Sequence, residues 1–294
     1  MTQFRSRNMG SNMGSTHAAR RVLALACAAV ALAARVRAEP VALKTTEMGH
    51  GPTIVFVHAL GGSRSDWLPI ARKLLGRYRV VLVDLPGHGE SPLPDPFSFA
   101  SVGEALDGVL ARQKADSTIV VGHQFGGRAA LAALAAHPGH ARGLVLIDVP
   151  VGTPIPIDDQ QKKQFLDFMD QSYESVAKMM FSSLGRDTTQ SKAIYALFTQ
   201  TAPATVKAFV REGFFSDGNK DAKSLKIPVE LVLTSRAWKL GSTPGATLKR
   251  MGWEDTTAVP RQLPDAGFWA MKDQPDSLAA LISAFATATL AVKK

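Results

Sequence analysis

The sequence predicts an α/β fold in which a mostly parallel β-sheet is flanked by helices. Short apolar runs of strand length alternate with helical patterns along 39–150 and again along 227–294. Helices between parallel strands make right-handed crossovers, so this alternation indicates repeated β-α-β units. Residues 151–226 contain helical patterns and no clear strand. We therefore expect an α/β core made of 39–150 and 227–294, with a helical cap at 151–226 inserted into it.

The first 38 residues have the layout of a secretory signal peptide. They begin with a basic segment that has no acidic residue, continue with an apolar, alanine-rich run at 22–34, and end in the small-residue cleavage site VRA at 36–38. The apolar run is too short to cross a bilayer as a helix, which makes an uncleaved anchor the weaker interpretation. We expect export to the periplasm or secretion, with membrane contact only through this segment. An RR pair at 20–21 and Cys27 leave the twin-arginine and lipoprotein routes open beside general secretion.

Charge and cysteine content argue against two classes of function. The signal peptide holds six arginines, at 5, 7, 20, 21, 35 and 37, so the formal net charge of +9 falls to +3 without it. A charge this small gives no reason to expect nucleic-acid binding. The single cysteine, Cys27, leaves with the signal peptide, so the mature chain has neither a disulfide nor a cysteine metal site. We expect no cofactor and no metal ion, and the oligomeric state stays open.

The predicted core strands are short, continuous apolar runs, as expected for strands covered on both faces. In chain order they are a looser edge run at 41–48, then TIVFV at 53–57, YRVVLVD at 78–84, STIVV at 117–121, GLVLID at 143–148, VELVLT at 229–234 and a last run at 256–263. Helical patterns separate them at 67–75, 97–114, 128–137, around 248–251 and at 275–292. Parallel strands have their carboxyl ends at one edge of the sheet, where sites form. His58, Asp84, Gln124 and Asp148 follow or end these strands and are the first site candidates.

The stretch GHQFGG at 122–127 predicts a sharp turn between a strand and a helix. Such a turn is a nucleophile elbow, in which the central residue has a strained backbone and small neighbours let the strand and helix approach closely. Gly122 and Gly126 are the small residues two positions before and after the centre. The central residue is Gln124, whose amide cannot attack a carbonyl carbon.

The expected cap has two amphipathic helical patterns, at 160–180 and 191–215, that are rich in phenylalanine and methionine. Most of these side chains are expected to be core residues of packed helices. A cap of this composition above the carboxyl ends of the strands also suits the wall of an apolar pocket.

Four motifs in the same order and spacing resemble the α/β-hydrolase superfamily, in the group that has a helical cap after the sixth strand. They are HALGG at 58–62, which is similar to the oxyanion loop, DLPGHGES at 84–91, GHQFGG at 122–127 and PDAGFW at 264–269. The resemblance that they support extends over nearly all of 41–294. The resemblance implies a serine-hydrolase fold, but function has to be argued from the site because this fold carries many functions.

The positions that correspond to the catalytic triad hold other residues. The resemblance places Gln124 at the nucleophile, Phe268 at the histidine and Ala237 in the loop where the acid is expected. The last histidine of the chain is His140, so no histidine can come from the loop after the last strand. Asp148, after the preceding strand, is a possible surrogate acid. Loss of one triad member lowers the rate by a factor of about 10⁴ to 10⁶.

These residues favour binding over catalysis. A polar head is expected to meet backbone N–H groups of an oxyanion pocket, and aromatic cap residues are expected to hold an apolar body. The candidate binding residues are His58, Ala59, Leu60, Gln124, Phe125, Arg236, Phe268 and Trp269. Our first hypothesis is therefore a non-catalytic, exported protein that binds a small apolar molecule with a carbonyl group.

Two alternatives stay open at this point. The first is an enzyme of altered chemistry, such as a lyase or isomerase, that uses Asp84, Asp148, His58 or Arg236. The second is a hydrolase of ester-type substrates seen as an inactivated variant. Ser91, His88 and His123 are interpreted as structural residues.

Overall fold

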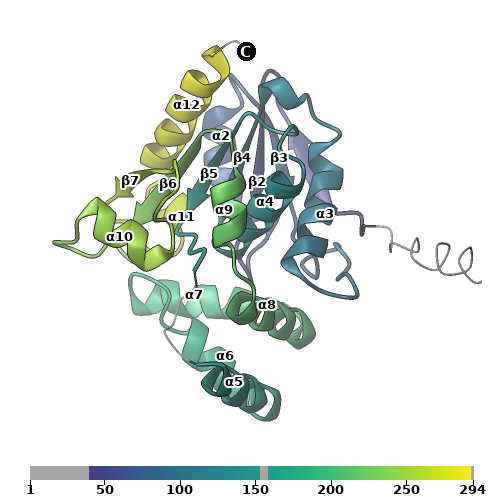
Figure 1. Ribbon diagram of the computed structural model, residues 1–294, viewed down its shortest axis with the longest axis vertical. Coiled ribbons are helices and arrows are strands. Elements are labelled where there is room, and N and C mark those ends of the chain that lie inside the picture. Colours follow the sequence, from purple (N-terminus) through teal and green to yellow (C-terminus); the bar gives the residue numbers. More distant parts are fainter. Residues whose placement is uncertain (1–39, 153–157, 293–294) are drawn as a thin grey trace, which may run out of the picture. The chain divides into compact units, whose positions relative to one another are not determined.

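The computed structural model describes residues 40–152 and 158–292 (Figure 1). The chain divides into two units, Met1–Glu39 and Pro40–Lys294. The predicted signal peptide at 1–38 lies outside the described residues, so export stays a prediction. Within the described ranges, no helix combines the length and the apolar character needed to cross a membrane.

A seven-stranded sheet forms the centre of the described chain, with the strand order β1-β3-β2-β4-β5-β6-β7. Only β1 is antiparallel to its neighbour, and the other pairings are parallel, which confirms the mostly parallel sheet. The strands are β1 (Thr45–Met48), β2 (Thr53–Val57), β3 (Arg79–Val83), β4 (Thr118–His123), β5 (Gly143–Ile147), β6 (Val229–Thr234) and β7 (Val259–Leu263). Both edge strands are shorter than the runs at 41–48 and 256–263 predicted, because only their last residues pair with a neighbour.

The sheet is covered on both faces because successive side chains of a strand point to opposite sides. In β2, Val55 and Val57 pack into one hydrophobic cluster, whereas Ile54 and Phe56 pack into another. On the first face α3 (Phe99–Leu110) and α9 (Asn219–Ser224) pack against α4 (Phe125–Ala136), and on the second face α2 (Leu68–Leu74) packs against α12 (Pro275–Ala291) (Figure 1). These two clusters explain why the central strands are continuous apolar runs with no polar face.

Five helices of the core lie where helical patterns were predicted, whereas the helix Asn219–Ser224 lies in the range predicted as the cap and the helix Ala270–Asp273 was not predicted. The core helices are α2 (Leu68–Leu74), α3 (Phe99–Leu110), α4 (Phe125–Ala136), α9 (Asn219–Ser224), α10 (Pro244–Met251), α11 (Ala270–Asp273) and α12 (Pro275–Ala291), with two short 3-10 helices at Arg64–Trp67 and Ala115–Ser117. The helix α3 begins at Ser98, whose side chain accepts a hydrogen bond from the N–H of Ser101 and so caps the helix.

Four of the five described helices between β5 and β6 gather beyond one end of the sheet (Figure 1). They are α5 (Asp159–Gln171), α6 (Tyr173–Phe181), α7 (Thr188–Phe198) and α8 (Pro203–Phe215). The single pattern at 160–180 is two helices, because Ser172 has the non-helical angles φ −137° and ψ 47°. The resemblance implied a cap after the sixth strand, but the inserted helices follow the fifth strand. The described chain has one strand fewer before the insertion than the resemblance implied.

An aromatic cluster joins the inserted helices to the core. Phe209 of α8 makes edge contacts with Phe97, Phe99 and Phe125, at ring-centroid distances of 4.8, 6.4 and 5.8 Å. Its ring also lies 5.7 Å from His88, in the loop after β3. Because Phe125 directly follows the elbow, α8 lies at the carboxyl ends of the strands and covers the region where the site was expected.

Candidate functional site

The elbow between β4 and α4 has the strained backbone that its sequence predicted. Gln124 has φ 51° and ψ −120°, a conformation that few residues other than glycine adopt. Such a residue costs about 1–3 kcal/mol, so the surrounding packing must hold it. The glycines supply that packing, because a Cβ on Gly122 would lie 2.5 Å from the Cα of Gly127.

Gly126 brings the start of α4 against the loop after β2. A Cβ at this position would lie 2.2 Å from the carbonyl oxygen of His58 and 2.7 Å from that of Val57, and backbone atoms cannot yield as a flexible side chain can. We expect Gly126→Ala to lower the free energy of unfolding by about 3 kcal/mol, measured by urea denaturation. The control is Gly108→Ala in α3, where a Cβ meets nothing within 4 Å and the change is expected to be neutral or stabilising. Equal unfolding midpoints for the two variants would contradict this close approach.

His58 holds the loop that corresponds to an oxyanion loop. Its Nδ1 lies 2.7 Å from the carbonyl oxygen of Ala59, and its Nε2 accepts the N–H of Leu85 at 3.0 Å. These partners require the neutral tautomer with the proton on Nδ1. Burial lowers the pKa of His58 to about 4, which keeps it in this neutral form near pH 7. Both ring nitrogens therefore have backbone partners.

Two further buried histidines surround this loop. His88 accepts the N–H of Gly61 on Nε2 at 3.1 Å, and its Nδ1 lies 3.0 Å from the carbonyl oxygen of Pro86. Burial, together with the nearby His58, lowers its pKa to about 3. His123 precedes the elbow residue, and its buried Nε2 has no hydrogen-bond partner in the described part of the chain. Burial lowers the pKa of His123 to about 3.

The position expected for a catalytic histidine is apolar. Phe268 is half-buried, and its ring lies 4.9 Å from the ring of His123. Only a small void of about 10 Å³ lies beside it, lined among others by Ala59, Leu60 and Trp269. The structure thus brings Phe268 and Trp269 to the predicted loop, where they pack closely and leave no room for a ligand larger than water.

No carboxylate occupies the loop after β6. Ala237 is buried there, and its N–H donates to the carbonyl oxygen of Thr234 at 3.1 Å. Asp148 reaches the same loop from the end of β5. Its Oδ1 accepts the N–H of Thr234 at 2.8 Å, and its Oδ2 accepts the Thr234 hydroxyl. Burial raises the pKa of Asp148 to about 6. Asp148 thus connects the ends of β5 and β6.

Arg236 lies apart from the elbow. It is exposed, and its Nη1 donates to the carbonyl oxygen of Leu184 at 3.2 Å. With Arg186 and Lys239 it lines an open surface groove that includes neither Gln124 nor Phe125. The remaining strand-end acid, Asp84, is buried and forms an ion pair with Arg64 at 2.9 Å.

A cavity of about 260 Å³ begins at the elbow and extends under the inserted helices. Its walls are mainly apolar, and its polar side chains are Gln124 and Arg128. The lining residues are Gln124, Phe125, Arg128, Pro150, Gly152, Met180, Val210, Gly213 and Phe214. The predicted site thus divides into two parts, because Gln124 and Phe125 line this cavity whereas His58, Phe268 and Trp269 line the small void beside it.

Arg128 is a cavity residue that the sequence analysis missed. Its guanidinium lies 4.8 Å from the ring of Phe99 and donates to the Ser216 hydroxyl at 3.0 Å. Its contacts with the carbonyl oxygens of Pro150 and Val151 are long, at 3.5 Å. No carboxylate of the described residues lies within 4.0 Å of it, although it is 7% exposed, and burial lowers its pKa. The signal was an arginine in the first turn of an otherwise alanine-rich helix.

Comparison with known proteins gives the same fold. A family model described as the alpha/beta hydrolase fold matches residues 52–226. The sn-1-specific diacylglycerol lipase ABHD11 of Mus musculus is 34% identical over 105 residues, which are 35% of this chain and 34% of that protein. The 2-succinyl-6-hydroxy-2,4-cyclohexadiene-1-carboxylate synthase of Yersinia pseudotuberculosis is 41% identical over 81 residues, 28% of this chain and 29% of that protein. The chain thus spans about a third of the length of these curated relatives.

Solved structures resemble the chain over most of its length. A thermophilic esterase from Thermogutta terrifontis has a TM-score of 0.70 at 20% identity and covers 85% of this chain and 94% of its own. An enol-lactonase from Burkholderia xenovorans has a TM-score of 0.66 at 19% identity and covers 83% and 96%. Identities this low show the fold alone. The family model covers more than half of the chain, and the chain belongs to the alpha/beta hydrolase fold family.

Proposed function

We propose that this protein is a non-catalytic member of its family that binds a small apolar molecule with a carbonyl or carboxylate group. The observation that carries the proposal is the cavity of about 260 Å³ that ends at Gln124 instead of at a nucleophile. Its apolar walls suit a hydrocarbon body, and its volume is near the lower end of ligand pockets.

The polar end of the cavity favours an oxygen-bearing head group. Phe125 is the first residue of α4, and N–H groups in the first turn of a helix have no partner within the helix. The same end of the helix carries a partial positive charge. The Gln124 amide can donate a hydrogen bond, and Arg128 adds a full positive charge. A carbonyl or carboxylate oxygen meets all of these donors.

The residues around the elbow do not supply hydrolysis. Gln124 is no nucleophile, Phe268 is no base, and the loop after β6 has no carboxylate. An amide and a phenyl ring are stable replacements that bind without reacting. We propose no cofactor and no metal ion at this site.

Two further parts of the proposal concern the setting of the protein. The basic and apolar layout of 1–38 supports export, with the protein in the periplasm or secreted. The charge of +3 outside this segment supports a small-molecule partner over a nucleic acid.

An ester hydrolase or a lyase with non-triad residues is the alternative, and the names of the relatives favour it. These include the diacylglycerol lipase that is 34% identical over 105 residues. The groups available for such chemistry are committed elsewhere, however. His58 is hydrogen-bonded on both nitrogens, Asp84 is paired with Arg64, and Asp148 holds Thr234. None of the three lines the cavity.

Three probes of one apolar body test the proposal. Phenylacetone carries a carbonyl, phenylacetate carries a carboxylate and propylbenzene carries neither. We expect the first two to raise the thermal unfolding midpoint and propylbenzene to bind about tenfold more weakly, because it leaves the polar end without a partner. Mass spectrometry of the small molecules that copurify with the protein identifies the natural ligand class.

A matched pair of cap variants locates the binding. Met180 lines the cavity and its neighbour Met179 is 60% exposed. We expect Met180→Trp to fill the cavity and weaken phenylacetone binding at least tenfold, whereas Met179→Trp leaves binding unchanged. Equal affinities in both variants, or no thermal shift with any probe, would remove the support for this cavity. Turnover of p-nitrophenyl esters at enzyme-like rates by the unaltered protein would establish the alternative.

A further inference from the structure

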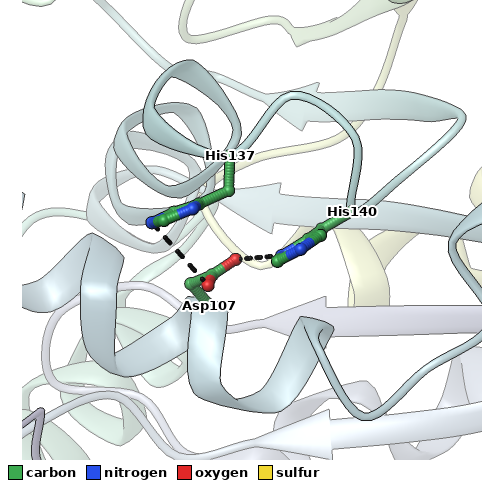
Figure 2. A group of neighbouring side chains, drawn as sticks. All are labelled: Asp107, His137 and His140. Carbon is green, nitrogen blue, oxygen red and sulfur yellow. Dashed lines mark hydrogen bonds and ion pairs between the residues drawn. The ribbon is translucent and has the colours of Figure 1, made fainter.

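Two histidines and an aspartate lie together at the end of α4 that is remote from the elbow (Figure 2). Asp107 lies in the last turn of α3, His137 directly follows α4, and His140 lies in the turn that leads to β5. The helix α4 separates this group from Gln124 by its length of about 18 Å, at 1.5 Å per residue. The group therefore belongs to neither the elbow nor the cavity.

Both imidazole rings face the same carboxylate group. His140 Nδ1 lies 2.5 Å from Asp107 Oδ1, and His137 Nε2 lies 3.7 Å from Asp107 Oδ2 (Figure 2). The nearest ligand atoms of the three residues all lie within 4.8 Å of one another. The two rings are parallel, with an interplanar angle of 9° and centroids 5.5 Å apart. Two nitrogens and one oxygen thus converge on one small volume.

These separations are close to those around a tetrahedral metal ion. Bonds of about 2.0–2.1 Å from zinc to nitrogen and oxygen place neighbouring ligand atoms about 3.3 Å apart. The contacts of 2.5 Å to Asp107 Oδ1 and 3.7 Å to Asp107 Oδ2 lie on either side of this value, and the three ligand atoms lie within 4.8 Å of one another, so small side-chain rotations bring them around one ion. A further carboxylate is near, because Glu104 Oε2 lies 3.4 Å from His137 Nε2.

The two helices that carry these residues are held at a fixed spacing. A Cβ on Gly103 of α3 would lie 2.9 Å from the backbone nitrogen of Ala133 in α4, so the helices are in close contact. The side chain of Asp107 is 12% exposed, whereas those of His137 and His140 are each 35% exposed. The carboxylate is thus anchored, and the imidazoles remain accessible to an ion from solvent. The carbonyl groups at the end of α4 also favour a positive charge at this place.

We propose that Asp107, His137 and His140 bind one divalent transition-metal ion, with zinc as the best fit. Two imidazoles and a carboxylate suit zinc, copper and nickel, whereas magnesium and calcium require mainly oxygen ligands. Three protein ligands leave a fourth position for water or for Glu104. The ion connects α3 to the turn between α4 and β5, and its role is to stabilise the fold.

Zinc titration of the full chain tests this site after treatment with a chelator. We expect calorimetry to give one zinc ion per chain and the thermal unfolding midpoint to rise by on the order of 5 °C at 100-fold excess over the dissociation constant. Magnesium and calcium are expected to give no shift. Cobalt in place of zinc is expected to give visible absorption bands of low-symmetry coordination, which report on the ligands without any activity assay.

Variants of the histidines decide the outcome. We expect His137→Gln with His140→Gln to weaken zinc binding at least 100-fold and to abolish the cobalt bands, while the metal-free unfolding midpoint confirms that the variant folds. The control is His50→Gln, since His50 is exposed and lies outside the cluster. Binding that persists in the double variant places the ion elsewhere and overturns the proposal. So does a wild-type protein with no zinc affinity below the millimolar range.

Discussion

Gln124→Ser alone is expected to leave ester hydrolysis at the background rate, whereas adding Phe268→His is expected to raise it about 10²-fold or more. The elbow backbone is already in the strained conformation that presents a nucleophile, with φ 51° at Gln124. A serine there has no base, because Phe268 lies against His123 and every buried histidine near it has a depressed pKa and a structural position. A histidine at 268 supplies general-base catalysis, which contributes about 10²- to 10⁴-fold.

Hydrolysis of p-nitrophenyl acetate and labelling by a fluorophosphonate probe measure this result. The control is Gln124→Ala with Phe268→His, which has the same base and no hydroxyl. The double variant stays far below a natural esterase because Ala237 leaves the new histidine without an orienting carboxylate, and loss of that group costs about 10⁴-fold. Activity in the Gln124→Ser variant alone would reveal a base that the geometry does not provide.

Much of the fold was predictable because its signals are local. The strands at 53–57 and 143–148 are covered on both faces, so nearly all of their residues are apolar. This continuous apolar run is visible in the sequence without knowledge of the fold. The spacing of Gly122 and Gly126 around Gln124 likewise encodes a close backbone approach, which the structure has. Each of these features depends on neighbours within a few residues.

The parts that sequence patterns did not reveal depend on partners far apart in the chain. Arg128 is a candidate binding residue because it lines the cavity, and residues of α6 and α8 form the opposite wall. The sequence patterns of α6 and α8 are those of any packed helix, so they do not indicate a cavity. Arg236 follows a strand as a site residue does, yet its side chain turns to Leu184 on the surface. The metal cluster pairs Asp107 with His140, 33 positions later, and no local pattern marks such a pair.

Acid is expected to unfold this protein with a midpoint between about pH 5 and 4. Burial lowers the pKa values of His58, His88 and His123 to about 4, 3 and 3. In the unfolded chain these groups bind protons below about pH 6.5, whereas in the folded chain they stay neutral until pH 4 or below. Their stabilising contribution is therefore complete above pH 6.5 and is lost as the pH falls. At pH 4.5 the loss is on the order of 3 kcal/mol per histidine, by linkage.

Asp148 acts in the opposite direction and offsets part of this loss, and burial also raises the pKa values of Asp221 and Glu230. The pKa of Asp148 is raised to about 6, so the folded chain binds its proton before the unfolded chain does, and this favours folding as the pH falls from 6 to 4. The gain at pH 4.5 is on the order of 2 kcal/mol. For the three histidines and Asp148 together, the loss of about 7 kcal/mol is comparable with the whole stability of a typical domain. Circular dichroism across an acid titration measures the midpoint.

His123→Phe separates this explanation from general acid denaturation. The Nε2 of His123 has no partner among the described residues, and the void of about 10 Å³ beside Phe268 accepts the larger ring. The variant is therefore expected to change stability at pH 7.5 by less than about 1 kcal/mol and to move the acid midpoint down by about one pH unit. His50→Phe is the control, because His50 is exposed and its loss leaves the midpoint where it was. Equal shifts in both variants would show that buried imidazoles do not set the acid limit. A shift of the acid midpoint in His123→Phe alone means that the neutral, buried His123 sets the lowest pH at which the protein, and with it the cavity, stays folded.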